Sequence, residues 1–143
     1  MLDAQRYRGE AYRDEVDFTR RLLWAHLIAG SLVVALFLFH EVFRWFAGAV
    51  IWYLVSLALM YVFMSGRRGF RLLLALWFLV AAAAGLYFIN RVFPDLDPAR
   101  GLLVPHGFIP LWVGFANLAY ATAALLLLFS KRVRRAGSVG FTL

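Results

Sequence analysis

Four long runs of apolar residues, separated by short polar segments, dominate this sequence. Within residues 22–39, 47–65, 72–89 and 108–129, His26 is the only residue whose side chain ionises near neutral pH. A helix needs about 20 mostly apolar residues to cross the hydrocarbon core of a bilayer. The pattern therefore predicts an all-α protein, an integral membrane four-helix bundle. The predicted spans are about residues 22–40, 47–65, 72–90 and 108–129.

The segments around these runs predict the remaining elements. Residues 1–21 hold five arginines and five acidic residues with no proline, which predicts a polar surface helix, either a solvated stalk or a docking arm. Residues 66–71 predict a short basic turn. Residues 91–107 contain three prolines, so we expect an external loop that does not continue the helix. Residues 131–143 predict a basic tail.

The positive charges gather on one side of the predicted spans. Twelve of the 15 Lys and Arg residues lie in the N-terminal segment, the 66–71 turn and the tail, and three, Arg44, Arg91 and Arg100, lie in the other two connections. Segments rich in Lys and Arg stay in the cytoplasm. We therefore expect a multi-pass protein of the plasma (inner) membrane with both termini, and the polar N-terminal helix, in the cytoplasm.

The composition agrees with a membrane protein and excludes several classes of function. Hydrophobic residues make up 64% of the 143 residues and charged residues 16%, against roughly 45–50% and 25% in soluble domains. The formal charge of +7 has a topological explanation, so we expect no nucleic-acid partner. The chain has no cysteine, which excludes disulfides, thiol nucleophiles and Cys-ligated metal sites.

The polar residues nearest the middle of the spans are candidates for helix packing or for a pore. Ser31, Ser56 and Asn117 lie close to the predicted midplane, and none of them can carry a charge. A proton or cation pathway through one chain normally needs an ionisable group at this depth. Ser and Asn side chains hydrogen-bond between helices at roughly 0.6–2 kcal/mol per bond. We expect packing, with an oligomer contact and a polar pore or ligand site as the alternatives for Asn117.

Three histidines raise the question of a haem or metal site. His26 lies about one turn inside the first span, where we expect a hydrogen-bonded interfacial histidine. His40 and His106 come at the same outer depth, so at most one bis-histidine haem b could form between them. Residues 40–44, HEVFR, begin like the H-E-x-x-H zinc motif but have Arg44 at the second ligand position. We therefore predict no metal and no cofactor, with haem b as a minor alternative.

Charged and histidine side chains on the outer side could form one external surface. Its members come from two connections: His40, Glu41, Arg44, Arg91, Asp95, Asp97, Arg100 and His106. The simplest interpretation is an outer cap in which Glu41 pairs with Arg44 at i+3. The alternative is a binding surface for an anion, a metal or a periplasmic partner, because much of the set lies on the proline-braced loop.

These observations favour a membrane protein without catalysis of its own. The sequence contains no midplane charge, catalytic constellation or phosphate-binding motif, while both faces carry polar extensions. We expect a small non-catalytic membrane subunit or scaffold of a larger complex. Its partners would be the lipid bilayer and other membrane subunits or copies of itself. A small homo-oligomeric channel or transporter is the alternative, and a haem- or quinone-associated membrane anchor subunit comes third.

Overall fold

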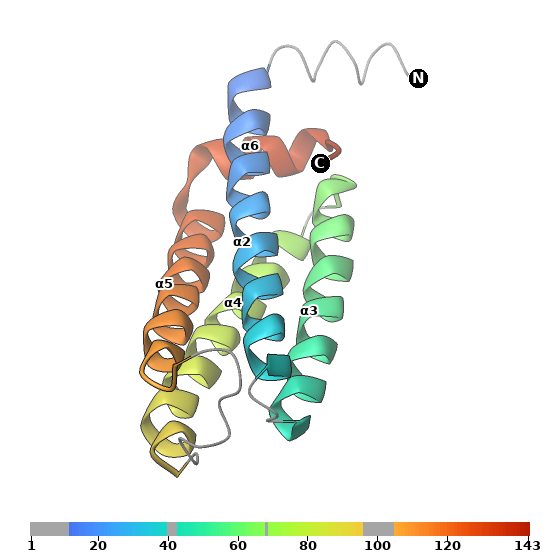
Figure 1. The fold of residues 1–143 in the computed structure, drawn as a ribbon. Helices are drawn as coiled ribbons and strands as arrows, with labels where there is room; N and C mark the ends of the chain where they lie inside the picture. The colour runs from blue at the N-terminus through green and yellow to red at the C-terminus, as the bar shows by residue number, and fades with distance from the viewer. Residues whose placement is uncertain (1–11, 40–42, 68, 96–104) are drawn as a thin grey trace.

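The computed structural model describes residues 12–39, 43–67, 69–95 and 105–143, and this part of the chain is all-helical (Figure 1). Four of its helices are long and apolar enough to cross a membrane, which confirms the prediction of four spans in an all-α protein. The elements are α2 (Arg13–Phe39), α3 (Phe43–Met64), α4 (Phe70–Tyr87), the π-helix η1 (Phe88–Val92), the 3-10 helix η2 (Phe93–Asp95), α5 (Phe108–Phe129) and α6 (Lys131–Val139).

The first span is part of one longer helix. Residues 22–39 of the predicted first span and the last nine residues of the predicted polar helix form the single element α2. No proline or glycine lies between Arg13 and the apolar run, so nothing ends the helix at the boundary. Asp17 also pairs with Arg13 at 4.0 Å and with Arg20 at 3.4 Å, at helical spacing. Residues 1–11 of the predicted polar helix lie outside the described residues.

The third span is longer than the sequence predicted. Helical structure continues from α4 through η1 and η2 to Asp95, so the first five residues of the predicted loop 91–107 are helical. Pro94, the second residue of η2, lacks the amide hydrogen that a continuing helix would use, yet it does not end the helical structure before Asp95. The fourth span, α5, has the predicted bounds 108–129.

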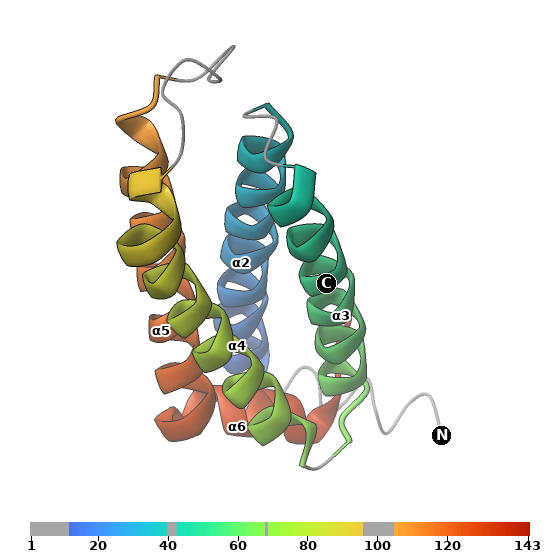
Figure 2. The same ribbon diagram turned by 90° about the horizontal axis from the view of Figure 1, so that it is seen from below.

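The core lies mainly between α4 and α5, which form the most extensive helix pair of the bundle. Leu74, Ala75 and Phe78 of α4 are fully buried, and so are Ala123 and Leu127 of α5. Small residues allow two helices to approach closely. α2 packs against this pair, while α3 is the least buried of the four spans. Figure 2 shows α4 and α5 side by side, with α3 on the other side of the bundle.

The C-terminal segment forms α6, a helix that the sequence reasoning did not predict. α6 lies across one end of the bundle (Figures 1 and 2). Ser130 caps it, because its hydroxyl accepts a hydrogen bond from the backbone N–H of Val133 at 3.4 Å. Val133 and Ala136 are fully buried, three residues apart on one helix face. The spacing of these two apolar residues within a basic run was the feature of the sequence that could have predicted the helix.

Residues after α6 fasten this end of the bundle. The backbone N–H of Phe141 donates to the carbonyl oxygen of Met64 at 2.9 Å, and Nε of Arg20 donates to the carbonyl oxygen of Thr142 at 2.5 Å. The first turns of α2, the turn between α3 and α4, and α6 with the residues that follow it therefore meet at one end. We call this the basic end, and we call the other, where η2 lies, the opposite end.

We predict that Gly137→Val detaches α6, because a Cβ atom at this glycine would overlap the ring of Phe63. Trypsin should then cleave within residues 131–135 about tenfold faster in detergent solution, since local opening exposes the backbone. Ser138→Val, at the adjacent exposed position, is the matched control and should digest like the native chain. Equal digestion of the two variants would show that α6 does not depend on this contact.

The predicted orientation can be tested with single cysteines, since the native chain has none. Asp95 and Ser138 are both exposed and lie at opposite ends of the bundle. In intact cells an impermeant maleimide should label Asp95→Cys, whereas Ser138→Cys should react only after the membrane is permeabilised. Labelling of Ser138→Cys alone in intact cells would invert the orientation.

Candidate functional site

The midplane residues Ser31 and Ser56 bond to different neighbours and do not meet. The hydroxyl of Ser31 lies 2.8 Å from the hydroxyl of Tyr53 on α3 and donates to the carbonyl oxygen of Leu27 at 2.8 Å. The hydroxyl of Ser56, which is buried, donates to the carbonyl oxygen of Trp52 at 2.9 Å. Each serine therefore takes part in contacts within one chain, and one of those contacts joins α2 to α3.

Ser56 also belongs to a stacked pair of tryptophans that joins α3 to α4. The indole N–H of Trp77 donates to the Ser56 hydroxyl at 2.9 Å. The rings of Trp52 and Trp77 stack with centroids 3.7 Å apart and an interplanar angle of 7°. The indole nitrogen of Trp52 is buried and has no hydrogen-bond partner among the described residues. Neither tryptophan is among the candidate residues that the sequence singles out.

Asn117, the third midplane residue, packs against a glycine on the neighbouring helix. Its side chain is 8% exposed and lies so close to Gly85 of α4 that a Cβ atom there would overlap the amide oxygen. The amide nitrogen has no hydrogen-bond partner among the described residues. A residue larger than glycine therefore cannot be placed opposite Asn117 without a shift in the packing, a relation that the sequence alone does not reveal.

A cavity of about 270 Å³ lies between the four spans. Asn117, Trp52 and Tyr53 line it together with Gly85 and Tyr120, whereas Ser31 and Ser56 do not. The structure thus brings one of the three predicted midplane residues to a cavity, beside aromatic residues that the sequence reasoning missed. An aromatic residue in an apolar helix can face either a cavity or lipid, and the sequence does not distinguish the two positions.

His26 links α2 to α5 near the basic end. One ring nitrogen, Nδ1, lies 2.7 Å from the carbonyl oxygen of Leu22, and the other, Nε2, lies 2.9 Å from the carbonyl oxygen of Ala119. The ring, which is 3% exposed, stacks on Phe78 with centroids 4.7 Å apart and meets the edge of Tyr120 at 5.4 Å. His26 is therefore a hydrogen-bonded residue of the helix interface.

The predicted outer surface lies only partly within the described residues. Arg91 and Asp95 are exposed on η1 and η2, and the ring of His106 stacks on Phe93 with centroids 4.5 Å apart. His40, Glu41, Asp97 and Arg100 lie outside the described residues, and so does the side chain of Arg44. The described part contains no group of three potential metal ligands. The outer surface and a haem between His40 and His106 therefore stay predictions.

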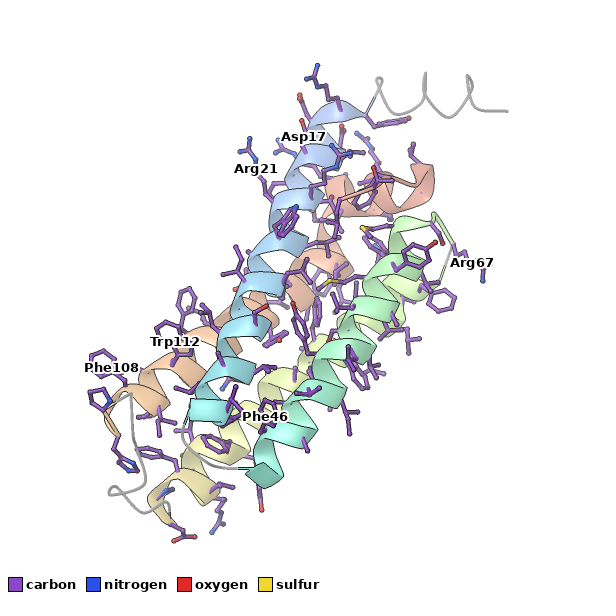
Figure 3. All side chains as sticks on the ribbon, turned by 45° about the vertical axis from the view of Figure 1, so that its right-hand side comes forward. Asp17, Arg21, Phe46, Arg67, Phe108 and Trp112 are labelled. Atoms are coloured by element: carbon purple, nitrogen blue, oxygen red, sulfur yellow. The ribbon has the colours of Figure 1, made fainter. Side chains whose placement is uncertain are left out.

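The basic end combines internal ion pairs with cations that face outward. The guanidinium of Arg135 lies 3.5 Å from the carboxylate of Glu15, and that of Arg132 lies 5.9 Å from the ring centroid of Phe18. These contacts fix α6 against α2. Arg21 and Arg67 project away from the bundle (Figure 3). We call five exposed cations of this end the basic face: Arg21, Arg67, Lys131, Arg132 and Arg134. Arg13 and Arg135 are also exposed but pair with Asp17 and Glu15.

We predict that Gly85→Ala destabilises the bundle by about 1–3 kcal/mol, the usual cost of overpacking. Asn117→Ala removes the overlapping amide, so the double variant should be more stable than Gly85→Ala alone. Denaturant unfolding in detergent, followed by helical circular dichroism, measures this coupling. Gly114→Ala is the control, because no atom lies within 4 Å of the added methyl group. Strictly additive effects of the two substitutions would contradict the contact.

Comparison with known proteins gives this chain no relative: no protein-family model, curated protein or solved structure matches it.

Proposed function

We propose that this chain is a non-catalytic membrane subunit that recruits a partner with acidic residues through its basic face, on the cytoplasmic side. One observation carries the proposal: α6 is an ordered helix held against the bundle, with its cations turned outward. The positive-inside rule requires only charge near the end of a span and does not require an ordered helix. Fixed positions for the charges are what a partner of complementary shape and charge needs.

The direction of the apolar side of α6 favours a protein partner over a lipid surface. An amphipathic helix that binds a membrane buries its apolar side in the headgroup region. In α6 the apolar residues Val133 and Ala136 are buried against the bundle. The exposed residues Lys131, Arg132 and Arg134 can then attract anionic lipids only by charge, whereas a protein can match their spacing.

The contacts of the midplane residues support a packing role for the spans. The hydroxyls of Ser31 and Ser56 bond to groups in the same chain, and Asn117 packs between α4 and α5. A pore formed by several copies would need some of these groups to face the shared axis instead. The homo-oligomeric channel or transporter therefore stays the alternative.

We predict that the chain, extracted from its host in mild detergent, has a native mass equal to itself plus at least one different chain. A mass that is a small multiple of the chain alone would instead support the homo-oligomeric channel, since closed rings are the usual form of such assemblies. A monomer without any other chain, at several detergent concentrations, would contradict both.

Charge reversal locates the docking surface. Lys131→Glu with Arg134→Glu should weaken association by about tenfold and lower the salt concentration at which the partner dissociates. Arg44→Glu with Arg91→Glu changes the charge equally at the opposite end and should leave association unchanged. The Ser138→Cys labelling test is repeated on both variants, because added acidic residues must not alter the orientation. Loss of the partner from the second variant alone would assign docking to the predicted outer surface.

A further inference from the structure

We propose that the cavity between α2, α3, α4 and α5 binds an uncharged, lipid-soluble ring compound with a carbonyl oxygen, of the quinone type. The lining residues lie within 30–37 of α2, 48–53 of α3, 81–88 of α4 and the start of η1, and 113–120 of α5. On every span this is the half nearer the opposite end. The site is independent of the basic face, so the failure of either proposal leaves the other standing.

Small residues on the facing sides of the helices create the space. Gly48, Ala49, Ala81, Ala84 and Ala116 supply part of the wall, and their small side chains leave volume between the helices unfilled. At Gly30 and Gly85 the side chains of Tyr53 and Asn117 occupy the adjacent space instead. The resulting cavity measures about 270 Å³. An apolar cavity of about 150 Å³ is enough to hold benzene. The space therefore suits a substituted ring system of one or two rings and is too small for a whole phospholipid.

The cavity opens toward lipid. Gly48 of α3 and Ala84 of α4 both line it and are both exposed, which places an opening between these two spans. At that depth the surroundings of a spanning helix are hydrocarbon. None of the residues that line the cavity carries a charge. A ligand therefore enters from the bilayer and has to be uncharged, since nothing in the wall would compensate a charge.

Two unpaired hydrogen-bond donors define the polar part of the ligand. The indole nitrogen of Trp52 and the amide nitrogen of Asn117 are buried, and neither has a partner among the described residues. A buried N–H without an acceptor costs free energy, and in hydrocarbon no water replaces the missing partner. The terminal torsion of an Asn side chain is soft, so the amide can turn toward a ligand. An oxygen acceptor, such as a carbonyl group, is the kind of partner that these donors lack.

The aromatic residues of the wall favour a flat ligand. Trp52 is held by its stack on Trp77, so the direction of its N–H is fixed. Phe37 and Phe88, which meet edge to face with centroids 5.0 Å apart, line the cavity together with Tyr120. Aromatic side chains pack favourably against another ring in offset or edge-to-face arrangements. A planar ring with a carbonyl oxygen matches both the aromatic wall and the donors.

The test uses the full chain in nanodiscs, with 2-methyl-1,4-naphthoquinone as the probe and 2-methylnaphthalene as its counterpart without oxygen. Equilibrium dialysis against empty nanodiscs separates binding to the protein from partition into lipid. We expect one saturable site per chain for the quinone. Its affinity should exceed that of the hydrocarbon by at least about tenfold, as expected for two additional hydrogen bonds.

Variants then locate the site. Gly48→Leu fills the opening and should weaken quinone binding by at least about tenfold, because the leucine occupies volume that the ring needs. Gly114→Leu is the matched control, since both glycines have no atom within 4 Å of an added Cβ and Gly114 does not line the cavity. Its affinity should equal that of the native chain.

Trp52→Phe and Asn117→Leu separate the donors from the space. Each should weaken quinone binding by about threefold to tenfold and leave 2-methylnaphthalene unaffected, because each replaces a hydrogen-bond donor by an apolar side chain. Circular dichroism and the elution volume in size-exclusion chromatography establish that each variant is folded. If Asn117→Leu does not fold, Trp52→Phe alone tests the role of the donors. The proposal is overturned by any of three results: no saturable site, equal affinity for the two probes, or quinone binding that survives Gly48→Leu.

Discussion

The close packing of α4 against α5 is the contact on which the rest of the bundle depends. Water cannot compete for contacts inside a bilayer, and apolar side chains gain little by leaving lipid for protein, so helix association relies on close packing and on a few hydrogen bonds. Ala75 and Ala123 let these two helices approach, and Leu74, Phe78 and Leu127 fill the interface. α2 is then added through His26, whose ring meets Phe78 on α4 and a carbonyl oxygen on α5.

The same packing explains why a cavity forms in the other half of the spans. Near the basic end, large residues such as Phe63 and Phe78 fill the bundle, and α6 closes it with Val133 and Ala136. Around the cavity, seven of the sixteen residues are glycine or alanine, and α3 contacts its neighbours there through the Trp52–Trp77 stack and the bond between Tyr53 and Ser31. Toward the opposite end a second buried cluster, formed by Leu36, Phe37, Phe88, Ile109 and Val113, fills the bundle again. The cavity therefore adjoins packed clusters on both sides.

The two proposals concern different parts of the bundle. The basic end presents fixed cations and suits a partner outside the membrane, whereas the cavity offers donors and aromatic rings to a molecule inside the membrane. The two sites use different residues and different physical interactions: charge complementarity across an aqueous surface, and hydrogen bonding with ring packing in hydrocarbon. Neither site requires the chain to carry out chemistry.

The sequence by itself determined the number of spans, their helical structure and, for α5, both ends. Backbone groups in lipid have to form hydrogen bonds within the protein, and for a run of about 20 apolar residues the helix is the structure that satisfies them. It did not reveal α6, the continuation of helix through Pro94, or the different surroundings of Ser31, Ser56 and Asn117. Hydropathy carries no information on which side of an apolar helix faces a neighbour, since lipid and protein interior are equally apolar. Only the tertiary structure decided that Asn117 meets Gly85 and lines a cavity with Trp52, because that depends on how four helices rotate and pack against one another.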